Sequence, residues 1–109
     1  MAGWTEWTQF KEENIKLIHP RDTGVYECAK RNRVVYIGKG VIRSRLLRHT
    51  QETSFLGVTR FHIRKTTPEE ADKAETRLLL SFKKTHGELP EINKNTPSQP
   101  DLFKKYLYG

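Results

Sequence analysis

Residues 24–40 read GVYECAKRNRVVYIGKG, and this stretch decides the sheet on which the rest of the chain is built. Two runs rich in β-branched and aromatic residues flank a basic polar segment, a pattern that predicts a β-hairpin. If the loop has three residues, Lys30 to Asn32, then Tyr26 lies directly opposite Tyr36 on one face of the sheet. A four-residue loop would place the two tyrosines on opposite faces. We expect the odd-length loop.

A basic helix is predicted after the hairpin, over roughly residues 41–51. At 100° per residue, one arc of this helix contains Ile42, Arg45, Leu46 and His49. Arg45 and His49 are four residues apart, so their side chains project side by side. Arg43 and Arg48 fall outside the arc. The helix therefore presents an arginine and a histidine together beside its apolar face.

A third strand is predicted over residues 58–65, where side chains alternate strictly. One face carries Thr59, Phe61 and Ile63, and the other carries Arg60, His62 and Arg64. Because His62 lies between two arginines, we expect it to face DNA or solvent rather than to bind a metal ion. The strand is predicted to have one basic face.

A long helix is predicted over residues 68–86 from signals at both of its ends. Thr67 can cap the helix, Pro68 suits the first helical position, and Glu70 completes a capping box. Gly87 is a typical C-terminal stop.

One acidic residue interrupts the apolar arc of this helix. The arc consists of Ala71, Ala74, Leu78, Leu79 and Phe82. Glu75 lies near its centre, where folding alone would not select a carboxylate. The alternative is that Glu75 has no functional role and that its side chain reaches solvent past a thin apolar edge. The position of Glu75 within the apolar arc favours a chemical site instead.

The ends of the chain are predicted to pack on the same domain. Trp4, Trp7 and Phe10 could form one face of a short helix or turn. Residues 94–109 end in aromatic and apolar residues and are expected to form a short packed helix or strap. We therefore expect one domain over residues 1–109 with its core at about 22–95. The expected fold is α/β (α+β), with a small, mainly antiparallel, three-stranded sheet flanked by helices.

Charge and composition favour a nucleic-acid partner. The chain has 20 Lys plus Arg and 13 Asp plus Glu, a net charge of +7 on 109 residues. A field of this sign attracts polyanions and supplies most non-specific affinity for nucleic acid. Cys28 is the only cysteine, which excludes an internal disulfide and a cysteine-based zinc site. A cytoplasmic protein without membrane contact is expected, since the sequence has neither a signal-peptide pattern nor an apolar run of ~20 residues.

The ordered set of residues resembles the GIY-YIG nuclease superfamily. The two tripeptides here are Gly24-Val25-Tyr26 and Tyr36-Ile37-Gly38. The continuation Tyr36-Ile37-Gly38-Lys39-Gly40 is similar to the N-terminal nuclease domain of bacterial excision-repair nucleases. Arg45, His49, Glu75 and Asn93 follow in the family's order, so the resemblance covers about residues 22–95. Relative to the family pattern, Arg45 follows Tyr36 by one residue fewer, and the interval from Glu75 to Asn93 is longer.

The resemblance implies a role for each of these residues. Glu75 would bind one divalent cation, Mg²⁺ or Mn²⁺, and Arg45 would clamp the scissile phosphate. Tyr26 would act as general base assisted by His49, with Tyr36 orienting the attacking water. The phosphate or nucleic-acid contacts expected in addition are Lys39, Arg43, Arg48, Arg60 and Asn93, the last by binding the active-site loop or capping the turn. The alternative for the tyrosines is an ordinary cross-strand pair.

The expected function is a metal-dependent endonuclease that cleaves duplex or branched DNA by direct attack of water. The family resemblance implies 5′-phosphate and 3′-hydroxyl ends. The main alternative is a catalytically silent nucleic-acid-binding module on the same scaffold, and a third is an interaction protein that binds an acidic partner. The sequence leaves open the oligomeric state and whether a partner protein supplies specificity.

Overall fold

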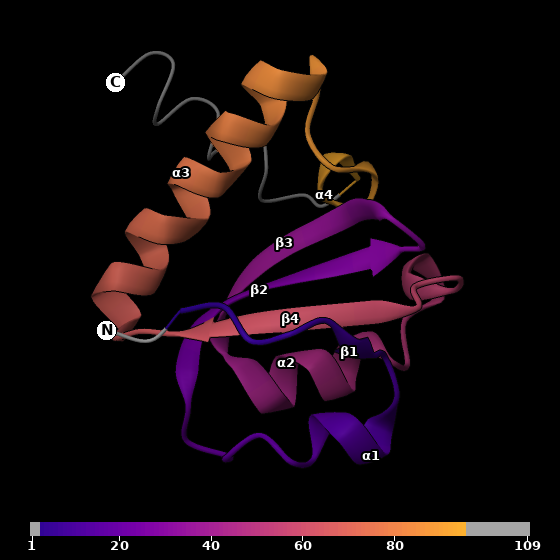
Figure 1. Ribbon diagram of the computed structural model, residues 1–109, viewed down its shortest axis with the longest axis vertical. Helices are drawn as coiled ribbons and strands as arrows, with labels where there is room; N and C mark the ends of the chain where they lie inside the picture. Colours follow the sequence, from indigo (N-terminus) through magenta and orange to yellow (C-terminus); the bar gives the residue numbers. More distant parts are fainter. Residues whose placement is uncertain (1–2, 96–109) are drawn as a thin grey trace.

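The computed structural model describes residues 3–95, which form an antiparallel sheet covered by helices on both faces (Figure 1). The elements in chain order are β1 (Thr8–Gln9), α1 (Glu12–Ile15), β2 (Thr23–Lys30), β3 (Arg33–Val41), α2 (Ile42–His49), the 3-10 turn η1 (Thr53–Phe55), β4 (Arg60–Lys65), α3 (Pro68–His86) and α4 (Glu91–Lys94). The strand order is β1-β4-β2-β3, with every neighbouring pair antiparallel. The predicted α+β class is confirmed, with four strands where three were expected.

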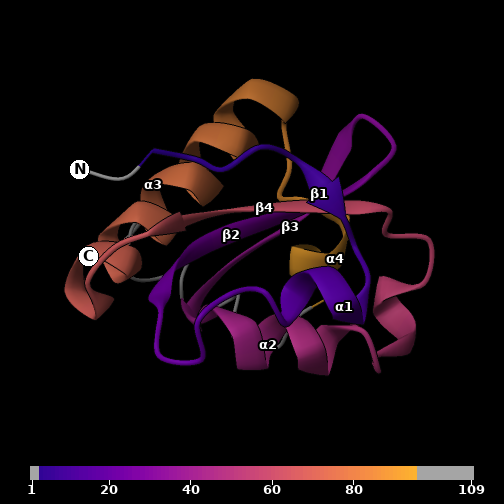
Figure 2. The ribbon, with the colours of Figure 1, turned by 60° about the horizontal axis from the view of Figure 1, so that its bottom comes forward.

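The two faces of the sheet are covered by different helices (Figure 2). On one face, Ile42 and Leu46 of α2 pack with Tyr26, Cys28 and residues of α1 and β4. On the other face, α3 packs on β2 and β3 through two smaller apolar clusters. The outer strand β3 therefore has α2 on one side and α3 on the other.

The fourth strand comes from the N-terminal segment. Thr8 and Gln9 pair with β4, and the Thr5 N–H donates to the Ile63 carbonyl at 2.8 Å. Trp4 and Trp7 stack on His62, with ring centroids 4.1 and 3.8 Å away. The prediction that this segment packs on the domain is confirmed, but the helix or turn suggested by the aromatic spacing is wrong. The free backbone groups of the β4 edge bind the segment in extended form.

The hairpin differs from its prediction in the loop but not in the face shared by the tyrosines. Lys30 pairs with Arg33, so the turn has two residues, and Arg31 has a positive φ of 55°. A two-residue turn alone would separate the tyrosines, but the register shifts between Cys28 and Ala29. This β-bulge adds one residue to β3, which returns Tyr26 and Tyr36 to the same face of the sheet.

As a result, the tyrosines are diagonal neighbours on one face rather than directly opposite. Tyr26 pairs with Gly38, and Tyr36 pairs with Cys28. The Tyr26 and Tyr36 ring centroids are 6.0 Å apart.

The two longer helices follow their local signals closely. The α3 helix has the predicted bounds, since the Thr67 hydroxyl accepts from the Glu70 N–H at 3.2 Å and Gly87 ends the helix with φ of 83°. The α2 helix lies within the predicted range. Within residues 3–95, no helix is both long and apolar enough to cross a membrane. The strap expected over 94–109 lies, beyond Asn95, outside the described residues.

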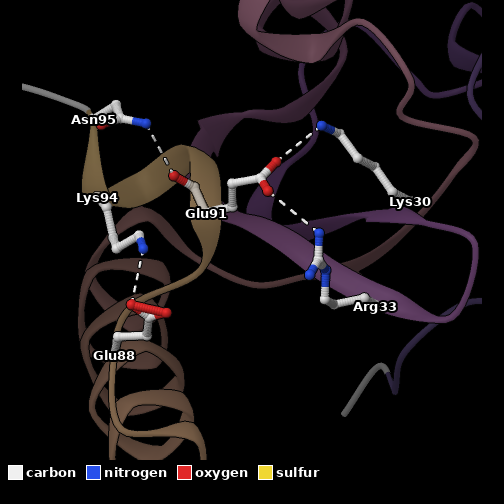
Figure 3. Close-up of polar contacts among 6 residues, drawn as sticks. All are labelled: Lys30, Arg33, Glu88, Glu91, Lys94 and Asn95. Carbon is white, nitrogen blue, oxygen red and sulfur yellow. Dashed lines mark hydrogen bonds and ion pairs between the residues drawn. The ribbon is translucent and has the colours of Figure 1, made fainter.

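A network of ion pairs fixes the short helix α4 against the hairpin (Figure 3). The Glu91 carboxylate binds Lys30 Nζ at 2.9 Å and Arg33 Nη2 at 3.3 Å. Lys94 Nζ lies 2.8 Å from a Glu88 oxygen. These contacts hold α4 in position, and with it Asn93, the residue of this helix that binds β3.

Asn93 completes the outer edge of β3. Its side chain is fully buried, accepts from the Ile37 N–H at 2.8 Å and donates to the Ile37 carbonyl at 2.9 Å. The amide therefore substitutes for a neighbouring strand at the position between Tyr36 and Gly38, which keeps this part of the outer strand in place.

We expect Asn93→Ala to destabilise the protein by about 2–4 kcal/mol, because it leaves two buried backbone groups without partners and creates a cavity. Urea unfolding followed by circular dichroism measures this loss. Asn95→Ala is the matched control, since its exposed amide makes one long 3.3 Å bond to the Glu91 carbonyl. Equal effects of the two substitutions would contradict the role assigned to Asn93.

Candidate active site

Three aromatic side chains from different elements meet on the α2 face of the sheet. Tyr26 Oη lies 2.7 Å from His49 Nε2, and both side chains are buried. Tyr36, which is half-buried, packs edge-on against His49 at 5.0 Å between ring centroids. The α2 helix begins directly after β3, so its last residue, His49, returns over the tyrosines.

The second nitrogen of the His49 ring also has a partner. His49 Nδ1 binds the carboxylate of Glu52, and the Phe55 ring stacks on the imidazole at 4.1 Å. Burial lowers the pKa of His49, while the hydrogen bond and charge of Glu52 act in the opposite direction. Glu52 was not among the predicted site residues, although its spacing of three residues from His49 is visible in the sequence.

Two glycines of the Tyr36–Gly40 segment allow side chains to lie directly on the strand. A Cβ at Gly38 would lie 2.5 Å from Tyr26 Cζ and 2.7 Å from Tyr36 Cε2. A Cβ at Gly40, where φ is 125°, would lie 2.4 Å from Arg45 Nε. The close approach of two phenol rings therefore requires glycine at position 38, and the positive φ favours glycine at position 40.

Glu75 is a half-buried acid on the face of α3 that packs against the sheet. Burial raises the pKa of its carboxyl, the nearby charge of Asp72 adds to this, and Lys39 and Arg45 oppose it. Within residues 3–95, no side chain forms an ion pair or hydrogen bond with this carboxylate.

The same charges reach the tyrosines. Burial raises the pKa of Tyr26 well above its ordinary value and also raises that of Tyr36. The Glu75 carboxylate raises both further, whereas Arg45 lowers both. Although α3 and the tyrosines are on opposite faces of the sheet, the charges of Glu75 and Arg45 therefore reach both phenols.

The predicted basic residues divide into two groups. Arg45 and Arg48 are exposed on α2, Arg43 is half-buried on the same helix, and Lys39 pairs with Asp72. Lys39 and Asp72 join β3 to α3 beside Glu75. Asp72 was not among the predicted site residues, although it precedes Glu75 by about one helical turn.

Two predicted nucleic-acid contacts do not join this group. Arg60 faces away from the tyrosines. Its guanidinium donates a hydrogen bond to Asn32 Oδ1 at 3.0 Å and lies over the Trp7 ring. Asn93 is fully buried, so it holds β3 and does not contact a ligand. Its predicted bond to the active-site segment is present, at Ile37.

The predicted basic face of β4 is also covered. The His62 side chain is 12% exposed, lies between two tryptophan rings and binds Glu27 at 2.7 Å. The expectation that His62 faces DNA or solvent is therefore wrong, because the N-terminal segment packs over it.

A cation at this site would use few protein ligands. Within the described residues, there is no group of three or more His, Cys, Asp or Glu arranged to hold a metal ion. The unpaired carboxylate of Glu75, with Asp72 one turn away, nevertheless fits a hard cation, because Mg²⁺ is commonly bound by one or two carboxylates plus water and substrate phosphate. Cys28 is no candidate nucleophile, because burial raises the pKa of its thiol.

Comparison of this chain with protein-family models, with curated proteins and with solved structures gave no match. The functional assignment therefore depends on the residues and geometry described above.

Proposed function

We propose that this protein is a metal-dependent endonuclease that hydrolyses DNA phosphodiester bonds by direct attack of water. The observation that carries the proposal is the convergence around β3 of side chains from four separate elements, β2, β3, α2 and α3. These side chains are Tyr26, Tyr36, Arg45, His49 and Glu75. A basic domain that only binds nucleic acid has no need of a half-buried carboxylate, without an ion-pair partner among residues 3–95, near one buried and one half-buried phenol.

Water activation is assigned to the tyrosines and His49. Burial keeps Tyr26 protonated, and ionising even an unperturbed phenol at pH 7 costs about 4 kcal/mol. Tyr26 therefore takes a proton from water only as its own proton passes to His49 Nε2, 2.7 Å away. The half-buried Tyr36 orients the water. Because Tyr26 is fully buried, this mechanism requires side chains around its hydroxyl to move when substrate binds.

Phosphate binding is assigned to the cations at the mouth of the site. Arg45 is exposed beside Gly40, and its planar guanidinium can donate two hydrogen bonds to a phosphate. Lys39 adds positive charge from the α3 side, and Arg43 and Arg48 continue the basic surface along α2. The net charge of +7 supports recruitment of a polyanion before these contacts form.

Glu75 would hold Mg²⁺ or Mn²⁺, and Asp72, which is paired with Lys39, would add negative charge one helical turn away. When bound, this ion polarises the phosphate and stabilises charge on the leaving oxygen. The 5′-phosphate and 3′-hydroxyl products are those implied by the GIY-YIG resemblance. Cys28 is a free, buried thiol, which supports a reducing compartment such as the cytoplasm as the place of action.

The test is nicking of supercoiled plasmid DNA by purified protein with Mg²⁺, Mn²⁺ or EDTA. We expect nicking with either ion and none with EDTA. Arg45→Ala should lower the rate by ~100-fold because it removes a preorganised phosphate ligand. DNA affinity, measured by fluorescence anisotropy, should change little, since other cations supply most of the binding.

Arg21→Ala is the control for loss of one exposed positive charge, because Arg21 lies in the connection before β2. It should nick at the wild-type rate. DNA binding without nicking of duplex, branched or single-stranded substrates would favour the catalytically silent module. Failure to bind DNA at any salt concentration would favour an acidic protein partner.

A further inference from the structure

We infer that Glu52 is a positioning residue that fixes the tautomer and orientation of His49 and thereby makes Tyr26, rather than Tyr36, the proton acceptor. This inference depends on the proposed nuclease activity and adds to it a residue and a direction of proton transfer. The observation behind it is a continuous chain of contacts. Tyr26 Oη binds His49 Nε2 at 2.7 Å, and His49 Nδ1 binds the Glu52 carboxylate.

The chemistry of these groups sets the direction of proton transfer. An ionised carboxylate can only accept hydrogen bonds, so the shared proton resides on His49 Nδ1. A neutral imidazole has one N–H, which leaves Nε2 with a free electron pair. Nε2 therefore accepts from the Tyr26 hydroxyl, and the phenol proton points toward the base that can take it.

The turn after α2 holds Glu52 in place for this role. The Glu52 N–H donates to the His49 carbonyl at 3.1 Å, and the Phe55 N–H donates to the Glu52 carbonyl at 3.0 Å. The Phe55 ring stacks on His49 with planes 14° apart. A single short segment therefore binds one ring nitrogen and covers one ring face, which fixes the imidazole.

The charges around His49 show what Glu52 contributes once the proton has moved. Arg48 and Arg45 on α2 both disfavour a positive imidazolium, as does burial. Glu52 is the group that favours it. With the side chain of Glu52 42% exposed and that of His49 4% exposed, the carboxylate lies on the solvent side of the ring, where the proton can later leave.

The complete step balances without a further reactant. The water oxygen forms a bond to phosphorus while the bond between phosphorus and O3′ breaks. The electron pair of the broken bond stays on O3′. The water proton passes to Tyr26 as the Tyr26 proton passes to His49. O3′ then takes a proton from solvent, and His49 returns its extra proton to solvent.

The experiment compares nicking rate against pH for wild type, Glu52→Gln and Glu52→Ala. The glutamine retains an acceptor oxygen but no charge, whereas alanine loses both. We expect a rate reduction of ~10-fold for the glutamine variant and ~100-fold for the alanine variant near neutral pH, by analogy with the range for partners that orient metal-binding histidines. Loss of the Glu52 charge lowers the pKa of His49, so the acidic limb of the profile should move to lower pH.

The control Glu13→Gln removes an exposed carboxylate on α1 and should leave the rate and the pH profile unchanged. DNA affinity and thermal stability are measured for each variant, because a merely structural role would move these and not the acidic limb. Wild-type rates and pH profiles in both Glu52 variants would overturn the inference while leaving the nuclease assignment intact. Absence of nicking by wild type would instead overturn the nuclease assignment, and the inferred proton path with it.

Discussion

Replacement of Glu75 by glutamine is expected to lower metal-dependent nicking by about 1000-fold while making the protein more stable. Glutamine has nearly the same size but cannot supply the negative charge that a hard cation requires. Loss of a group that stabilises developing charge typically costs 10²–10³ in rate. Stability should rise because burial raises the pKa of Glu75, so ionised Glu75 disfavours the folded state.

The stability gain should depend on pH in a defined direction. A carboxyl whose pKa is higher in the folded state binds a proton more tightly there than in the unfolded chain. The cost of ionised Glu75 is therefore complete above its folded pKa, shrinks as pH falls through that value, and is absent below the unfolded value of 4.5. Thermal melts of both proteins without metal should differ most at neutral pH and converge near pH 4.

Glu69→Gln provides the matched control, since it removes an exposed carboxylate from the first turn of the same helix. It should nick at the wild-type rate, and its melting temperature should not rise, because acids stabilise a helix N-terminus. Persistent nicking by pure Glu75→Gln would exclude Glu75 as a metal ligand. An unchanged or lower melting temperature at neutral pH would contradict the burial cost assigned to its carboxylate.

The sequence predicted those features of the fold that depend on neighbouring residues, such as the ends of a helix and the face on which a side chain lies. The cap residue Thr67 and the stop residue Gly87 gave the bounds of α3 because each acts on the helix end beside it. Glu75 could be identified because one helical period shows which residues face inward. The shared face of Tyr26 and Tyr36 was predicted correctly, but through a loop length that the bulge replaces.

Contacts between distant segments could not be predicted in this way. The N-terminal strand depends on a free edge of β4, about 50 residues away in sequence, which no local pattern reports. The burial of His62 follows from the same pairing. Asp72 was missed because its partner, Lys39, is 33 residues away in sequence. Glu52 is different, because its spacing of three residues from His49 is local and can be read from the sequence.

Replacement of Gly38 by alanine is expected to disrupt both the core and the site. The new methyl would lie 2.5 Å from Tyr26 Cζ, 2.6 Å from its hydroxyl and 2.7 Å from Tyr36 Cε2, all well inside van der Waals contact. Tyr26 is fully buried between the sheet and α2, so its ring cannot turn aside without moving neighbours. Overpacking of this kind costs about 1–3 kcal/mol or more.

The substitution should also slow catalysis in the protein that remains folded. Displacement of the Tyr26 ring by about 1 Å breaks its 2.7 Å contact with His49 Nε2, and a misplacement of that size can cost ~100-fold in rate. We therefore expect Gly38→Ala to nick at least ~100-fold more slowly under conditions where urea unfolding shows that it is still folded. Gly3→Ala is the control, because a Cβ there has no atom within 4 Å. It separates the clash from the general stabilisation that alanine gives by restricting the unfolded chain. A Gly38→Ala protein with wild-type stability and nicking would show that the two rings do not lie over this glycine, and the assignment of Tyr26 and Tyr36 to one site would fail with it.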